Sequence, residues 1–112
     1  MTYTKEIKDG ILKLQFSGDL IGENNGPELV DLVNDAITSG VNQCILNIAE
    51  VRYINSSGIG VLITLLTKFR NQNGELYIVK PSEHVNKLLI MTKLQAIFNI
   101  VQTEEEVLQK FK

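Results

Sequence analysis

Two short, mostly apolar segments, residues 43–51 and 75–80, flank a longer segment whose apolar residues recur at helical spacing. Short apolar runs of this length are typical of strands that are buried in a sheet. A connection long enough to hold a helix allows two such strands to run parallel in one sheet. The strand–helix–strand order therefore favours an α/β fold, in which helices cover a sheet with parallel pairs.

Residues 3–18 predict two further strands joined by a tight turn, because Asp9-Gly10 is a strong hairpin signal between apolar runs. The glycine- and asparagine-rich residues 18–26 predict a loop. These segments place an antiparallel pair ahead of the strand–helix–strand unit.

The first helix is expected to open at Pro27, whose fixed φ suits a first turn, with Asn25 or Gly26 as its cap. Gly40 is expected to end it. One face of this helix should carry the apolar residues Leu29, Leu32, Val33, Ala36 and Ile37.

The helix after residues 43–51 is expected to end near Gly74, and Ser82 to cap a short third helix. Residues 96–101 predict a last strand. Thr103 and Glu106 have the spacing of a capping box that starts a terminal helix. That helix should present Val107, Leu108 and Phe111 on one face.

The expected architecture is thus a mixed sheet of about four to five strands covered by about four helices. The sequence shows no linker, repeat or low-complexity segment, so residues 1–112 are predicted to form a single domain. A composition that is 44% hydrophobic and 21% charged favours a folded chain over a disordered one.

The charge pattern excludes two classes of partner. Eleven lysines and arginines and 13 acidic residues give a net charge of −2, and the basic residues do not cluster. Binding to nucleic acid or to an anionic membrane surface is therefore not expected. The apolar run 58–66 is too short to span a bilayer, and residues 1–10 lack an apolar signal core, so a cytoplasmic protein is expected.

The side chains that most often bind metals or act as nucleophiles are scarce. Cys44 is the single cysteine and is expected to be a buried small hydrophobe, and His84 is the single histidine, expected at the surface. No histidine, cysteine and carboxylate group has metal-ligand spacing, so neither a metal nor a cofactor is predicted.

The stretch YINSSGIG, residues 53–60, places two hydroxyls and two glycines at the predicted start of the second helix. Asn55, Ser56 and Ser57 are all good helix caps, so a structural role is one interpretation. A regulatory phosphorylation site is another, because a helix start stabilises negative charge.

Enzyme motifs fit this stretch poorly. A nucleophile elbow at Ser56 needs a glycine two residues earlier, where Ile54 stands. A dinucleotide fingerprint needs a glycine at Ile63, and a phosphate-binding loop needs a Gly-Lys-Ser/Thr sequence that is absent. The protein is therefore predicted not to be an enzyme, and a nucleotide-binding module remains a minor alternative.

The residues VRYINSSGIGVLI, at 51–63, resemble the motif of STAS domains of the anti-sigma factor antagonist type. The family motif is a strand, then Asp-Ser-Ser/Ala-Gly-Leu/Ile-Gly, then a helix. Residues 88–108 also resemble the closing pattern of the family, and the resemblance covers almost the whole chain.

This resemblance implies a bacterial partner-switching protein. Such proteins bind an anti-sigma factor, usually a serine kinase with a histidine-kinase-like ATPase fold, and so release a sigma factor. The kinase phosphorylates a serine that corresponds to Ser56, which breaks the complex, and a PPM-type phosphatase restores it. Ser56 is thus the predicted phosphorylation site and Ser57 the second choice.

One departure from the family motif creates an alternative. The Asp of the motif is Asn55 here, a neutral residue that can cap a helix but cannot act as a base or help to bind a cation. The alternative function is a STAS adaptor in another bacterial signalling complex, with the phospho-switch weakened or lost.

The partner-binding surface is expected where the loop at residues 21–25 meets the start of the second helix, at the carboxyl ends of the strands. Ile59 is expected to be exposed enough to contact the partner, although its helical spacing also fits a core position. The predicted binding residues are Gly22, Glu23, Asn24, Asn55, Ser56, Ser57, Gly58 and Ile59.

Overall fold

The computed structural model describes residues 2–110. These residues form five strands, four α-helices and one short 3₁₀ helix. In chain order the elements are β1 (Thr2–Lys8), β2 (Ile11–Leu20), α1 (Gly22–Thr38), β3 (Gln43–Ile54), α2 (Ser56–Arg70), β4 (Glu75–Val79), α3 (Glu83–Met91), η1 (Leu94–Ala96), β5 (Asn99–Val101) and α4 (Glu104–Lys110).

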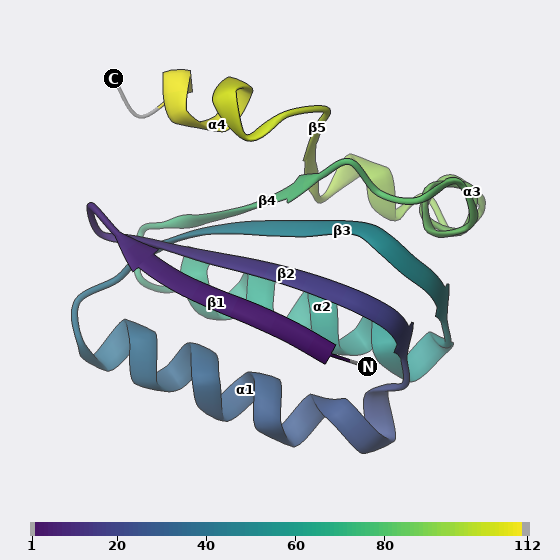
Figure 1. The fold of residues 1–112 in the computed structure, drawn as a ribbon, viewed down its shortest axis with the longest axis horizontal. Helices are drawn as coiled ribbons and strands as arrows, with labels where there is room; N and C mark the ends of the chain where they lie inside the picture. Colours follow the sequence, from purple (N-terminus) through teal and green to yellow (C-terminus); the bar gives the residue numbers. More distant parts are fainter. Residues whose placement is uncertain (1, 111–112) are drawn as a thin grey trace.

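The five strands make one mixed sheet in the order β1-β2-β3-β4-β5 (Figure 1). The pair β1–β2 is antiparallel around the Asp9-Gly10 turn, and the other three pairs are parallel. The fold class, the strand number and the four helices expected from the sequence are confirmed.

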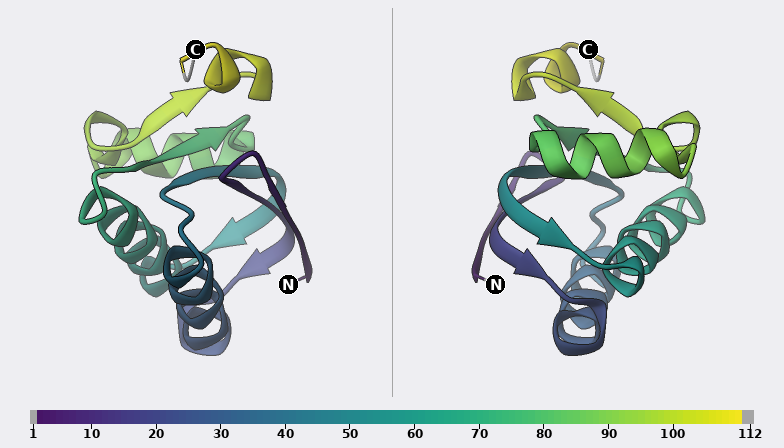
Figure 2. Two further views of the ribbon diagram at one scale, coloured as in Figure 1. Left: turned by 90° about the vertical axis from the view of Figure 1, so that its left-hand side faces the viewer. Right: turned by 90° about the vertical axis from the view of Figure 1, so that its right-hand side faces the viewer.

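The main core lies between one face of the sheet and the helices α1 and α2, which lie side by side on that face (Figure 2). Alternate residues of β2 and β3 point into it, as the period of a strand requires. These residues are Leu12, Leu14 and Phe16 from β2 and Cys44, Leu46 and Ile48 from β3. On the opposite face, Val107 of α4 packs in a smaller cluster with Ile11, Ile45, Val79 and Val101.

The strands β2 and β3 end at the same level, because Leu20 pairs with Ile54 in their parallel register. Two register shifts occur earlier in β2, between Gln15 and Ser17 and between Gly18 and Asp19. One residue follows each strand, and then α1 and α2 begin. The two helices therefore start next to each other at one end of the sheet (Figure 1).

The start of α1 differs from the expectation. Residues 18–26 are not a loop, because β2 continues to Leu20 and the helix already begins at Gly22. Pro27 is therefore the sixth residue of the helix, and neither Asn25 nor Gly26 is its cap. The cap position is held by Ile21, whose N–H donates to Asn25 Oδ1 at 3.1 Å, so an asparagine inside the helix supports its start.

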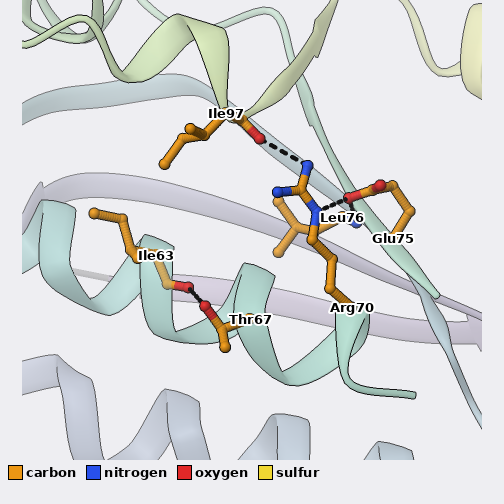
Figure 3. Close-up of polar contacts among 6 residues, drawn as sticks. All are labelled: Ile63, Thr67, Arg70, Glu75, Leu76 and Ile97. Atoms are coloured by element: carbon orange, nitrogen blue, oxygen red, sulfur yellow. Dashed lines mark hydrogen bonds and ion pairs between the residues drawn. The ribbon is translucent and has the colours of Figure 1, made fainter. Parts of the chain in front are cut away.

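The carboxyl end of α2 is fixed to the sheet by Arg70 (Figure 3). Its Nε donates to Glu75 Oε1 at 2.9 Å, and its Nη2 donates to the carbonyl of Ile97 at 2.7 Å. The same Glu75 oxygen accepts from the N–H of Leu76 at 3.2 Å. One turn earlier, the Thr67 hydroxyl donates to the carbonyl of Ile63 within the helix.

The last third of the chain follows the expected order with one difference. Ser82 caps α3, since it accepts from the N–H of Val85, and Thr103 accepts from the N–H of Glu106 at the start of α4. The expected strand 96–101 is reduced to β5, because η1 ends at its first residue and residues 97–98 form a turn and a bend before the strand begins. Phe111, expected on the terminal helix, lies outside the described residues.

Candidate functional site

The start of α2 is held by the side chain of Asn55, which follows directly after β3. Its Oδ1 accepts from the N–H of Gly58 at 2.7 Å, which satisfies one of the free amides of the helix. The same oxygen accepts from the N–H of Gly22 at 3.2 Å. One asparagine thus caps α2 and contacts the first residue of α1.

Gly22 allows the two helix starts to touch. A Cβ added at this position would lie 2.3 Å from both the carbonyl carbon and the carbonyl oxygen of Ser57. A Cβ at Gly58 would lie 2.6 Å from the carbonyl oxygen of Leu20. Both distances are too short for any side chain, so these two glycines are required by backbone packing. Gly60 has open space around it.

Glu23 extends from the first turn of α1 to the start of α2. Its Oε2 accepts from the Ser57 hydroxyl at 2.5 Å and from Asn55 Nδ2 at 3.0 Å. The hydrogen bond from Ser57, followed by that from Asn55, lowers the pKa of the Glu23 carboxyl below its ordinary value. Glu23 is therefore an ionised carboxylate at the junction between the two helices.

Ser56 differs from Ser57 in its surroundings. Ser56 is the first residue of α2 and is exposed, and its hydroxyl makes no hydrogen bond to any of residues 2–110. Ser57 is partly buried, and its hydroxyl lies 2.5 Å from Glu23 and 3.1 Å from Asn55 Oδ1. Of the two adjacent serines, only Ser56 presents a free hydroxyl to the surroundings.

The structure brings Gly22, Glu23, Asn55 and Ser57 together by direct contact, and Ser56 adjoins them; we call these five residues the Ser56 site. Asn24 follows Glu23 and is exposed. The expectation that residues 21–25 and the second helix start lie at the same end of the sheet is confirmed, although the first of these segments is mostly helix.

The expectation for Ile59 is wrong. Its side chain is only 7% exposed and belongs to the main core, because its position on α2 points to the sheet. Gly22 and Gly58 are buried as well. The exposed residues of the predicted surface are therefore Glu23, Asn24 and Ser56, with Asn55 and Ser57 partly exposed.

Two aromatic side chains near the end of β3 were not singled out as a pair from the sequence. Tyr53, which is 46% exposed, stacks on His84 of α3 with ring centroids 6.0 Å apart. The expected surface position of His84 is confirmed. The pairing joins residues 31 positions apart in the chain, and only the fold reveals it.

Two absences hold for the residues that the structure describes. Residues 2–110 contain no group of three or more histidine, cysteine or acidic side chains placed to hold a metal ion. Within the same range, the longest apolar helical stretch falls short of what is needed to cross a bilayer.

The mixed sheet, with α1 and α2 on one face and a capped serine motif at the start of α2, defines an α/β domain, and comparison with known proteins identifies its family. The family model described as "STAS domain" matches residues 2–107. The chain therefore belongs to the STAS domain family, and the resemblance seen in the sequence is confirmed.

Relatives of known description include bacterial anti-sigma factor antagonists. A protein of Thermotoga neapolitana described as a candidate anti-sigma factor antagonist is 29% identical over 77 residues, which cover 69% of this chain and 68% of the relative. The crystal structure of a Thermotoga maritima protein with the same description has a TM-score of 0.86 at 26% identity, and the match covers 96% of this chain and 92% of the other.

The fold also matches SpoIIAA, described as an anti-sigma factor antagonist and as a Bacillus cell fate determinant. Its unphosphorylated form has a TM-score of 0.77 at 19% identity, covering 98% of this chain and 97% of SpoIIAA. Its phosphorylated form has a TM-score of 0.76 at 18% identity, covering 99% and 100%. At these identities the likeness concerns the fold alone.

Proposed function

We propose that this protein is an anti-sigma factor antagonist that binds an anti-sigma factor and frees a sigma factor. Its binding would be switched off by phosphorylation of Ser56. Membership of the STAS family and the description of its bacterial relatives support the class of function. The single observation that carries the switch is the exposed, unengaged hydroxyl of Ser56 at the first position of α2.

Phosphorylation at this position is compatible with the fold. A phosphoserine adds a charge of about −1.5 to −2, and the dipole and free amides of a helix start stabilise negative charge. Since the Ser56 hydroxyl makes no hydrogen bond with any of residues 2–110, a phosphate there breaks none. The modification would change the surface and leave the hydrogen bonds of the neighbouring Asn55 in place.

The proposed partners follow from the same switch. The anti-sigma factor would be a serine kinase with a histidine-kinase-like ATPase fold, and it would transfer phosphate to Ser56 while bound to this surface. A PPM-type serine phosphatase would remove the phosphate. A phosphate within the interface would add repulsion and a desolvation cost, and so would release the kinase.

The neighbours of Asn55 suit a neutral amide at this position, because they offer it both a donor role and acceptor roles. Its amide nitrogen donates to Glu23 while its oxygen accepts from Gly22 and Gly58. An aspartate could not donate, and its charge would face the Glu23 carboxylate. Asn55 is therefore compatible with an intact helix start, and the phosphorylation itself would depend on a base supplied by the kinase.

The test is recovery of the partner and mapping of the modification. The unmodified chain is immobilised and used to recover binding proteins from the native cell. A recovered serine kinase is then purified and incubated with the chain and ATP, and the phosphate is located by tandem mass spectrometry. The proposal predicts phosphate on Ser56 and none in Ser56→Ala.

A different outcome would favour the adaptor alternative. Recovery of sensor or membrane components alone, with Ser56 unmodified, would assign the chain to another signalling complex. Recovery of the kinase with tight binding but no phosphate on Ser56 would retain the antagonist role and remove the switch.

A further inference from the structure

We propose that Glu23 selects between the two adjacent serines, so that phosphate is directed to Ser56 and excluded from Ser57. The proposal rests on the proposed function, because it concerns the phosphorylation of the same site. Glu23 is a positioning residue in this account, since it acts through Ser57 and Asn55 and not on the phosphate donor.

The hydroxyl of Ser57 has one proton and two acceptors within reach. Glu23 Oε2 lies at 2.5 Å and Asn55 Oδ1 at 3.1 Å. Asn55 Oδ1 already accepts from two backbone amides, whereas the carboxylate is charged and nearer. The proton is therefore directed at Glu23, in a strong charge-assisted hydrogen bond.

Phosphoryl transfer to Ser57 requires the hydrogen bond from its hydroxyl to Glu23 to break. The serine oxygen forms a bond to the γ-phosphorus of a nucleoside triphosphate, while the bond from that phosphorus to the β-phosphate oxygen breaks and the diphosphate leaves. The hydroxyl proton passes to a base on the kinase. At Ser57 the kinase must first displace Glu23, whereas at Ser56 no hydrogen bond from residues 2–110 competes.

The product at Ser57 is also disfavoured by charge. A phosphate on this oxygen would lie beside the carboxylate that now accepts its proton, and two like charges at this distance repel. Asn55 and Ser57 both donate to the carboxylate and lower the pKa of Glu23, which makes it a weak base. Glu23 therefore holds the Ser57 hydroxyl without activating it.

Two substitutions separate the hydrogen bonds from the charge. Asn55 and Ser57 both donate to the same oxygen, Oε2. In Glu23→Gln the single amide oxygen can take this position, so that both hydrogen bonds are kept and the charge is lost. In Glu23→Ala both the hydrogen bonds and the charge are lost.

The matched control is Asp31→Ala. Asp31 is an exposed carboxylate of α1, about 12 Å along the helix from Glu23 at 1.5 Å per residue. The substitution removes the same charge from the same helix. The Asp31 side chain makes no hydrogen bond or ion pair with any of residues 2–110, so no such contact is lost. Thermal unfolding of each variant verifies that the fold is retained.

The experiment measures the share of phosphate on each serine by tandem mass spectrometry, after incubation of each variant with the partner kinase and ATP. The ratio is internal to one sample, so a change in kinase affinity does not alter it. We expect phosphate almost entirely on Ser56 in the unsubstituted chain. The Ser57 share should rise about tenfold in Glu23→Ala, because a charge-assisted hydrogen bond and a like-charge contact are both removed, and by less in Glu23→Gln.

A second pair of variants isolates Ser57. In Ser56→Ala, Ser57 should be almost unmodified, and in the double variant with Glu23→Ala it should become a substrate.

An unchanged Ser57 share in Glu23→Ala, or an equal rise in Asp31→Ala, would overturn the inference while the phospho-switch at Ser56 stands. A fall in Ser57 phosphorylation in the double variant would show instead that Glu23 activates this serine. Absence of phosphate from both serines in the unsubstituted chain would overturn the switch and the inference together.

Discussion

The amide of Asn55 donates to the carboxylate of Glu23 at 3.0 Å, across 32 positions of sequence. The carbonyl oxygen of the same amide faces the N–H groups of Gly22 and Gly58. The amide nitrogen of Asn55 thus meets an acceptor and its oxygen meets two donors. Asn55 and Glu23 together link the starts of α1 and α2.

This pairing predicts that both alanine and aspartate at position 55 lower the stability of the protein. Asn55→Ala should lose the cap of α2 and destabilise the protein by about 0.5–2 kcal/mol. Asn55→Asp keeps the cap but places its charge against Glu23, so it should also lower stability, although asparagine and aspartate are equivalent caps in general. Adding Glu23→Gln to Asn55→Asp should recover most of that loss, as measured by urea unfolding at low salt. A double variant no more stable than Asn55→Asp would contradict the pairing.

Two glycines near the helix starts, Gly22 of the Ser56 site and Gly60 of α2, predict opposite effects of substitution by alanine. Gly22→Ala should destabilise the protein by about 1–3 kcal/mol, since its Cβ would meet the Ser57 carbonyl group and force the two helix starts apart. Gly60→Ala is the matched control in α2, where a Cβ meets open space and raises helix propensity. It should stabilise by about 0.5–1 kcal/mol. Denaturant unfolding measures both, and a tolerated Gly22→Ala would refute the close contact.

The lowered pKa of Glu23 predicts a pH dependence with a definite sign. A carboxyl whose pKa is lowered by folding adds stability above its ordinary pKa, and this contribution is lost as the pH falls through the folded-state pKa. Ser57→Ala removes the largest cause, so the pKa of Glu23 should rise towards its ordinary value. Carbon-detected NMR titration of the Glu23 carboxyl follows this directly. An unchanged pKa in Ser57→Ala would show that the hydrogen bond is not formed in solution.

Cys44 should be inert in the folded protein. Its side chain is fully buried in the main core, and burial raises the pKa of its thiol far above the ordinary value. We expect no reaction with an aromatic disulfide reagent at neutral pH until denaturant unfolds the chain, and then one thiol per chain. Fast labelling without denaturant would show that this part of β3 opens readily.

Local patterns were sufficient to predict most of the fold. The Asp9-Gly10 turn, the apolar strands β3 and β4 and the caps Ser82 and Thr103 act over a few residues, so the sequence displays them. The start of α1 was missed because glycines and asparagines favour loops locally. Tertiary contact overrides that preference, since Gly22 is placed against Ser57 and Asn55.

The sequence predicted where the candidate site lies, but not which hydrogen bonds its residues make with one another. The serine motif identified the start of α2, whereas the hydrogen bond from Ser57 to Glu23 joins residues 34 positions apart and depends on the register of β2 and β3. Ile59 was misplaced because helical spacing fits both a core position and the edge of a helix start. Its burial follows from how α2 is rotated against the sheet, which the motif alone does not determine.

The central claim is that a phosphate on Ser56 abolishes binding to the anti-sigma factor. Isothermal titration calorimetry of the purified anti-sigma factor with the unmodified chain, and with the chain phosphorylated stoichiometrically at Ser56, measures it directly. We predict that phosphorylation weakens binding at least about a hundredfold, because burying a charged phosphate in an interface costs several kcal/mol of desolvation. Equal affinity of the two forms would contradict the account.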